Sequence, residues 1–192
     1  MMLIGALALA VSAPSFNCAK AVSDVERIIC ADEQLGQSDR AVATLYRLAV
    51  KRDQRVLQAQ REWLRSRDQC HNAYCLLSSY EQRVDDLIAS VGSAREYRNG
   101  PHGSLSVVAL GKGLYAFSVQ NLWVGTVAGA VNTAGASGVF ELAGARGERQ
   151  PFADYDAGWR LTRLSRNGWR VECLPDETSC GGVNAIIDGD YR

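Results

Sequence analysis

Histidine is scarce in this sequence, and no two cysteines form a CxxC pair. The only histidines are His71 and His102, and neither lies near a motif that would supply a nucleophile. His71 directly follows Cys70, a spacing that suits shared binding of one zinc ion poorly. The sequence therefore predicts a protein that is not an enzyme and that has no metal site and no cofactor.

Two pairs of aspartates leave an alternative open. Asp154 and Asp156 would share one side of a strand, as would Asp188 and Asp190, and such pairs can act as glycosidase carboxylates or calcium ligands. Aspartates of this kind are more often solvated turn residues. A hydrolase is therefore the least favoured class.

Neither sign of charge is in excess. Lysine and arginine total 21, aspartate and glutamate also total 21, and the formal net charge is zero. Nucleic acids and anionic membrane surfaces bind proteins that carry a clear basic excess. We therefore expect no nucleic-acid partner.

Long apolar runs are absent apart from one at the N-terminus, over residues 3–11. This run is too short to span a bilayer, and the small residues after it suit cleavage behind Ala10 or Ala13. Residues 1–13 are thus predicted to be a signal peptide. The segment before Cys18 lacks the small residue of a lipid-attachment site, so we expect a soluble periplasmic or secreted protein with no stable membrane span.

Cysteine is present in an even number, which agrees with an oxidising compartment. The six are Cys18, Cys30, Cys70, Cys75, Cys173 and Cys180. The two late cysteines are expected to pair with each other, whereas the first four allow three connectivities. Among these we favour the local closures, 18 with 30 and 70 with 75.

The first half has helical patterns. Ser23 and Glu26 form a capping box that begins a short helix ending near Cys30, and Asp32 or Ser38 can cap the next one. Gly36 lowers helix propensity and favours the later start. Apolar stripes then follow at helical spacing, one on the second helix (Val42, Leu45, Tyr46, Ala49) and one on the last (Leu77, Tyr80, Val84, Leu87, Ile88, Val91). These stripes predict an antiparallel hairpin that also contacts Leu57, with Trp63 covering its end.

The second half has the pattern of an antiparallel β structure. Residues 96–103 contain Asn99, Gly100 and Pro101 and are predicted to be a linker, and glycine-bounded strand-like segments follow, including 122–131 and 183–188. Residues 111–113 predict a hairpin loop, and Asn167 with Gly168 predicts a two-residue turn that pairs Arg163 with Glu172. The expected fold class is α+β in two domains: a disulfide-stapled helical bundle over 14–95 and a small antiparallel β-barrel or sandwich over 104–192.

An ordered set of residues runs through segment 15–90: Phe16, Asn17, Cys18, Glu26, Ile29, Cys30, Leu35, Asp39, Leu45, Tyr46, Gln60, Arg61, Trp63, Leu64, Arg67, Asp68, Cys70, Cys75, Leu76, Tyr80 and Arg83. This set resembles the N-terminal domain of the LprI-like lysozyme-inhibitor family. Members are small exported helical domains with paired cysteines. The resemblance implies a lysozyme or another envelope protein as the partner.

A second resemblance lies in the β half. Residues 136–140 resemble the Ser-Gly loop that the periplasmic C-type lysozyme inhibitors insert into the lysozyme cleft, although the matching lysine is missing here. An inhibitor of a glycosidase must place a hydroxyl or a cation between catalytic carboxylates. The resemblance therefore implies a target-binding loop with Ser137, Arg146 and Arg149. The alternative function is a non-inhibitory module that binds a cell-wall glycan or an envelope protein.

Overall fold

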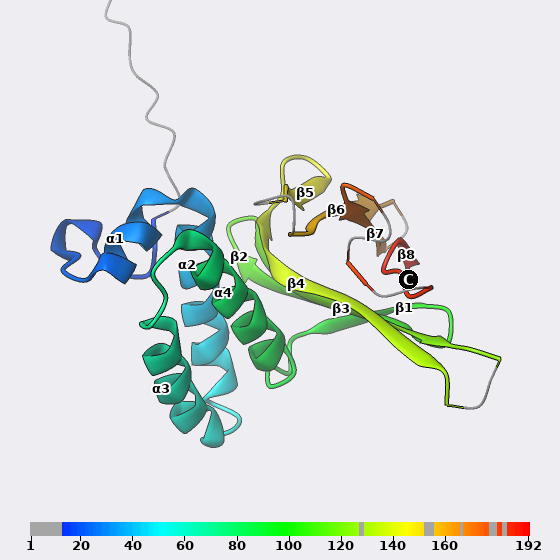
Figure 1. The fold of residues 1–192 in the computed structure, drawn as a ribbon, viewed down its shortest axis with the longest axis horizontal. Coiled ribbons are helices and arrows are strands. Elements are labelled where there is room, and N and C mark those ends of the chain that lie inside the picture. The colour runs from blue at the N-terminus through cyan, green and yellow to red at the C-terminus, as the bar shows by residue number, and fades with distance from the viewer. Residues whose placement is uncertain (1–12, 127–128, 152–155, 166, 177–179, 182–183) are drawn as a thin grey trace, which may run out of the picture.

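The computed structural model describes residues 13–126, 129–151, 156–165, 167–176, 180–181 and 184–192. Nearly all of the expected signal peptide lies outside the described residues, as does Asp154. The described part is a mixed α and β structure of three layers: helices, a first sheet and a second sheet (Figure 1).

Helix starts follow the caps that the sequence contains. Helix α1 (Asp24–Ala31) begins with the predicted capping box, in which Ser23 and Glu26 each accept a hydrogen bond from the other's backbone N–H. Helix α2 (Glu33–Ala49) begins at its cap Asp32 rather than at Ser38, so the Gly36 argument for a later start is wrong. Helices α3 (Arg55–Arg67) and α4 (Ala73–Ile88) complete the layer.

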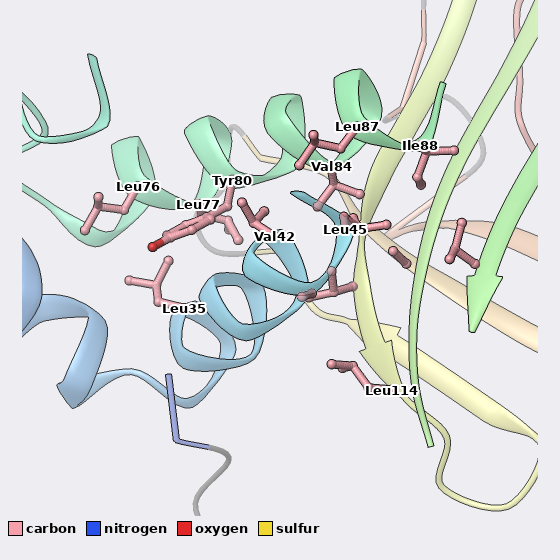
Figure 2. Close-up of a cluster of buried hydrophobic side chains, with 14 of the residues drawn as sticks. Leu35, Val42, Leu45, Leu76, Leu77, Tyr80, Val84, Leu87, Ile88 and Leu114 are labelled. Carbon is pink, nitrogen blue, oxygen red and sulfur yellow. The ribbon is translucent and has the colours of Figure 1, made fainter. Parts of the chain in front are cut away.

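Both predicted apolar stripes are largely buried where α2 crosses α4 (Figure 2). Val42 and Leu45 face Tyr80, Val84 and Leu87, as the periodicity predicts. Leu57, expected to pack on this hairpin, is 37% exposed and does not belong to the buried core.

Two antiparallel sheets follow the helices within the described residues. The first has the order β1 (Arg95–Asn99), β2 (Gly103–Gly111), β3 (Leu114–Val124) and β4 (Val131–Glu141). The second has the order β5 (Arg146–Arg149), β6 (Gly158–Leu164), β7 (Gly168–Leu174) and β8 (Gly189–Tyr191). The predicted hairpin at Gly111 is confirmed, because Lys112 and Gly113 both adopt positive φ angles, as a tight hairpin turn requires.

Several strand predictions need correction. Residues 96–99, expected to be part of a linker, belong to β1, and β5 was not expected. Segment 122–131 is not one strand but the end of β3 and the start of β4. The final strand lies at Gly189–Tyr191, after the segment 183–188 in which it was expected. Short strands of this kind carry little periodicity to detect.

The first sheet contributes to two hydrophobic cores. Leu114 and Ala116 of β3 pack with the helices, whereas Phe117 and Val119 pack with the second sheet. The helical core thus extends across the expected domain boundary into the β half. The two sheets face each other as a sandwich. Few backbone hydrogen bonds join their edges, such as those between Arg98 and Arg192. Within the described residues the sheets do not close into a barrel.

All six cysteines are paired, and the favoured pairing is confirmed. Disulfides join Cys18 to Cys30, Cys70 to Cys75 and Cys173 to Cys180, with Cα separations of 5.7, 5.6 and 5.9 Å. Three disulfides in a chain of this size indicate folding in an oxidising extracellular environment. Among the helices that the structure describes, none has the length and apolar character needed to cross a membrane.

Candidate functional site

A groove opens at one end of the sandwich, between β1, β2 and β3 of the first sheet and the β6–β7 hairpin of the second. Two adjoining hollows of about 320 and 260 Å³ form it. They share four side chains, those of Arg95, Tyr97, Arg163 and Trp169, and Tyr115 lines the second hollow. We call these five residues the arginine–aromatic groove. Its size lies at the lower end of the range for small-molecule sites.

Arg163 reaches the groove because of the register of the β6–β7 hairpin, which differs from the predicted one. Its partner across the hairpin is Trp169, not Glu172, and the first pair is Leu164 with Gly168. Three residues, 165–167, separate this pair, one more than the predicted two, and Asn167 adopts a φ of 64° directly before Gly168. Directly paired residues point to the same face of a sheet, and Arg163 therefore lies beside Trp169.

Aromatic rings hold the Arg163 guanidinium. Its carbon lies 5.3 Å from the centre of the Tyr115 ring and 5.1 Å from that of Trp169, within the range of cation–π attraction. One Nη atom also donates to the Tyr115 hydroxyl at 2.8 Å. Trp169 itself is buried, so the guanidinium forms the exposed surface above it.

Comparison with family models, curated proteins and solved structures finds no match to this chain. The assignment of function therefore rests on the geometry of the chain's own residues.

The three residues of the expected target-binding loop are not together on a loop. Ser137 lies within β4 and donates to the carbonyl oxygen of Glu81 on α4 at 2.8 Å. Arg149 ends β5, and its side chain is only 4% exposed. Arg146 is exposed at the start of β5. Ser137 and Arg149 thus face the interior between the helices and the sandwich, away from the surface a target would contact.

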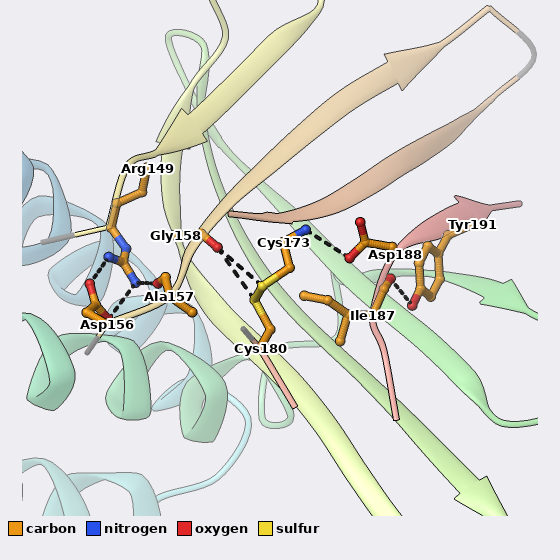
Figure 3. Close-up of a disulfide and its surroundings, with 9 residues drawn as sticks. All are labelled: Arg149, Asp156, Ala157, Gly158, Cys173, Cys180, Ile187, Asp188 and Tyr191. Atoms are coloured by element: carbon orange, nitrogen blue, oxygen red, sulfur yellow. Dashed lines mark hydrogen bonds and ion pairs between the residues drawn. A yellow bond between two sulfur atoms is a disulfide. The ribbon is translucent and has the colours of Figure 1, made fainter. Parts of the chain in front are cut away.

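Arg149 joins two carboxylates in that interior, and we call Glu81, Arg149 and Asp156 the Glu81 cluster. Its guanidinium lies 3.0 Å from Glu81 and 2.5 Å from Asp156. It also donates to the Ala157 carbonyl oxygen at 2.5 Å, and Figure 3 shows its contacts with Asp156 and Ala157. Burial raises the pKa of Glu81 to about 7; Arg149 opposes this shift, whereas the charge of Asp156 adds to it. A single cation therefore pairs with two partly buried acids.

This raised pKa predicts a pH-dependent stability. The folded protein binds the Glu81 proton more tightly than the unfolded chain, whose pKa is near 4.5, so the stabilisation is complete below about pH 4.5 and is lost as the pH rises through 7. The shift corresponds to roughly 3 kcal/mol, and partial exposure of the side chain reduces the expected change to about 2 kcal/mol. Urea unfolding between pH 4.5 and 8 should show this fall in the native protein but not in Glu81→Gln. Parallel profiles for the two proteins would contradict the assignment.

A second polar cluster involves the residues that carry the LprI-like resemblance: Asp39, Trp63, Arg67 and Tyr80, which we call the Asp39 cluster. Asp39 accepts hydrogen bonds from the Tyr80 hydroxyl at 2.9 Å and from the Ser15 backbone N–H at 2.7 Å. Arg67 stands 3.8 Å from Asp39 and lies over the Trp63 ring at 5.3 Å. Burial raises the pKa of Tyr80, which stays protonated and donates. The cluster fixes α3 and the N-terminal segment to the α2–α4 hairpin.

The remaining candidate residues have structural partners. Asp188 accepts from the Cys173 backbone N–H at 2.9 Å beside the third disulfide (Figure 3), and Asp190 pairs with Arg170 at 2.7 Å. Trp159 is buried between the sheets. Among the residues that the structure describes, no three histidines, cysteines or acids are grouped to hold a metal ion.

Sequence reasoning missed the groove. Arg95 lies at the expected domain boundary, and Tyr97 lies in the expected linker. The only sequence signal at Tyr115 is the alternation of side chains along β3. The sequence does contain one signal of the groove, the tryptophan at position 169, directly after the turn residues. In the correct register this residue pairs with Arg163.

Proposed function

We propose that this chain is an exported, non-catalytic binding protein of the bacterial envelope, and that it binds a cell-wall glycan in the arginine–aromatic groove. The groove itself carries this proposal. It combines aromatic side chains with exposed guanidinium groups at the mouth of a rigid sandwich, and its hollows suit a ligand of one or two sugar rings.

Two further observations support an envelope location. Three disulfides require an oxidising compartment, which for a bacterial protein is the periplasm or the exterior. Four of the residues that resemble the LprI-like family meet in the Asp39 cluster, where they stabilise the helical layer. We accordingly propose residues 15–90 as an LprI-like domain and residues 1–13 as its signal peptide.

Co-sedimentation with insoluble peptidoglycan tests the proposal. The native protein should sediment with the wall, and Ala109→Trp should reduce the bound fraction at least about tenfold, because Ala109 is exposed in the second hollow and a tryptophan there would fill it. Ala143→Trp is the matched control, an exposed alanine outside both hollows. Retention of Ala109→Trp at the native level would contradict binding in the groove.

Inhibition of a lysozyme is the second candidate. It is favoured by the family resemblance and by a hollow of about 310 Å³ lined by Glu33, Glu141 and Glu148, since lysozymes are typically basic. Ion pairs neutralise two of these acids, Glu141 with Arg40 and Glu148 with Arg160, both at 2.7 Å. A turbidity assay with c-type, g-type and i-type lysozymes tests it, and full lysis at micromolar protein would exclude it.

A further inference from the structure

The position of Arg163 is fixed before any ligand binds. Its strand is anchored where its backbone N–H donates to the Ala145 carbonyl oxygen at 2.7 Å, and its guanidinium rests on two rings. The Tyr115 ring is in turn stacked on Phe140, with 5.5 Å between the ring centres. An arginine held in this way loses little conformational entropy on binding a ligand.

The groove also has positive charge that no acid offsets. Among the described residues, neither Arg95 nor Arg163 forms an ion pair, and no carboxylate lines either hollow. Glu96, the acid next to Arg95 in sequence, pairs with Arg98. One side-chain donor of Arg163 bonds to the Tyr115 hydroxyl, and among the described residues no acceptor bonds to the others, which can therefore bind a ligand.

Two guanidinium groups at one groove suit an oxyanion. Guanidinium presents two parallel N–H donors that match the two oxygens of a carboxylate, which is the geometry of the strongest charge-assisted pairs. Resting on the proposed glycan-binding function, we infer that the ligand is a carboxylate-bearing fragment of the cell wall. Arg163 binds the carboxylate, and Arg95 adds a second cation at the same groove.

Titration calorimetry tests this inference. The probe is a soluble disaccharide-tetrapeptide released from peptidoglycan, compared with a neutral N-acetylglucosamine oligomer of similar size. The full chain without its signal peptide should bind the acidic probe at least about tenfold more tightly than the neutral one. Arg163→Gln should remove that preference, and Arg163→Lys should restore it only in part because lysine lacks the two-donor fork.

Arg146→Gln is the matched control, since Arg146 is an exposed arginine outside the groove and should bind both probes as the native protein does. Arg163→Gln loses two cation–π contacts and one hydrogen bond at an exposed site, so its melting temperature should fall by no more than about 5 °C and the variant should be folded at 25 °C. Equal binding of the two probes, or unchanged binding by Arg163→Gln, would overturn the carboxylate assignment while leaving the glycan function in place. If inorganic phosphate competed with the acidic probe at equal strength, the groove would be a general oxyanion site and not a site for carboxylates. Absence of binding to either probe would overturn both proposals.

Discussion

Replacing Arg149 by glutamine should lower the free energy of unfolding by about 3 to 5 kcal/mol, the range found when one partner of a buried ion pair is removed. The substitution leaves Glu81 and Asp156 without their shared cation in an interior where their side chains are 21% and 12% exposed. Denaturant unfolding at pH 7.5 measures the loss. It should be smaller at pH 5, where Glu81 is protonated and no longer requires the cation.

Arg146→Gln provides the comparison, because Arg146 lies on the same short strand but faces solvent. Its effect should stay within about 0.5 kcal/mol. If the two variants lost equal stability, the Glu81 cluster would not stabilise the fold in the way described. Arg149 and Arg146 were both candidates for contact with a target. The comparison of their variants shows whether Arg149 instead stabilises the fold.

Replacing Asp39 by alanine should cost about 2 to 4 kcal/mol. The Tyr80 hydroxyl and the Ser15 backbone N–H would lose their acceptor, and Arg67 would lose its buried counter-charge. Thermal and denaturant unfolding measure the change. Near-ultraviolet circular dichroism should change as well, because Trp63 packs against Tyr80 at 5.4 Å in the same cluster.

Asp68→Ala is the control for this second variant. Asp68 is closer to Arg67 than Asp39 is, at 2.7 Å against 3.8 Å, but its side chain is 53% exposed. Solvent screening should limit its contribution to about 1 kcal/mol or less. A larger loss at Asp68 than at Asp39 would show that distance, rather than burial, decides the energy here.

Local chemistry explains which parts of the fold could be predicted. Ser23 and Asp32 are hydrogen-bonding caps at helix starts, and the stripes on α2 and α4 bury the residues that helical spacing selects. The Gly111 hairpin has a positive φ angle at each turn residue, which Gly113 readily supplies. The disulfides followed from sequence proximity. Each of these signals is contained within a few neighbouring residues.

The remainder depends on contacts between distant segments. Arg149 is typical of a surface loop residue until Glu81, far away in the sequence, is placed against it. Ser137 matches an inhibitory loop by its neighbours, yet its hydroxyl is bonded to α4. The register of β6 and β7 depends on the length of the turn between them, which has three residues and not the two that Asn167 and Gly168 predicted. The groove could not be predicted for the same reason, because Arg163 joins it only in the observed register.

Alternate side chains of strand β3 pack in the two hydrophobic cores, so the core of the helices is incomplete until β3 is in place. In the export that we propose, the helices would leave the translocation channel before β3 and β4, so the apolar side chains of Val84 and Ile88 would have no β partner until later segments arrive. The Cys18–Cys30 and Cys70–Cys75 disulfides both lie within this early segment and can form at that stage. Oxidation of the helical layer would then shorten the time during which a half-emerged chain is exposed to aggregation and proteolysis.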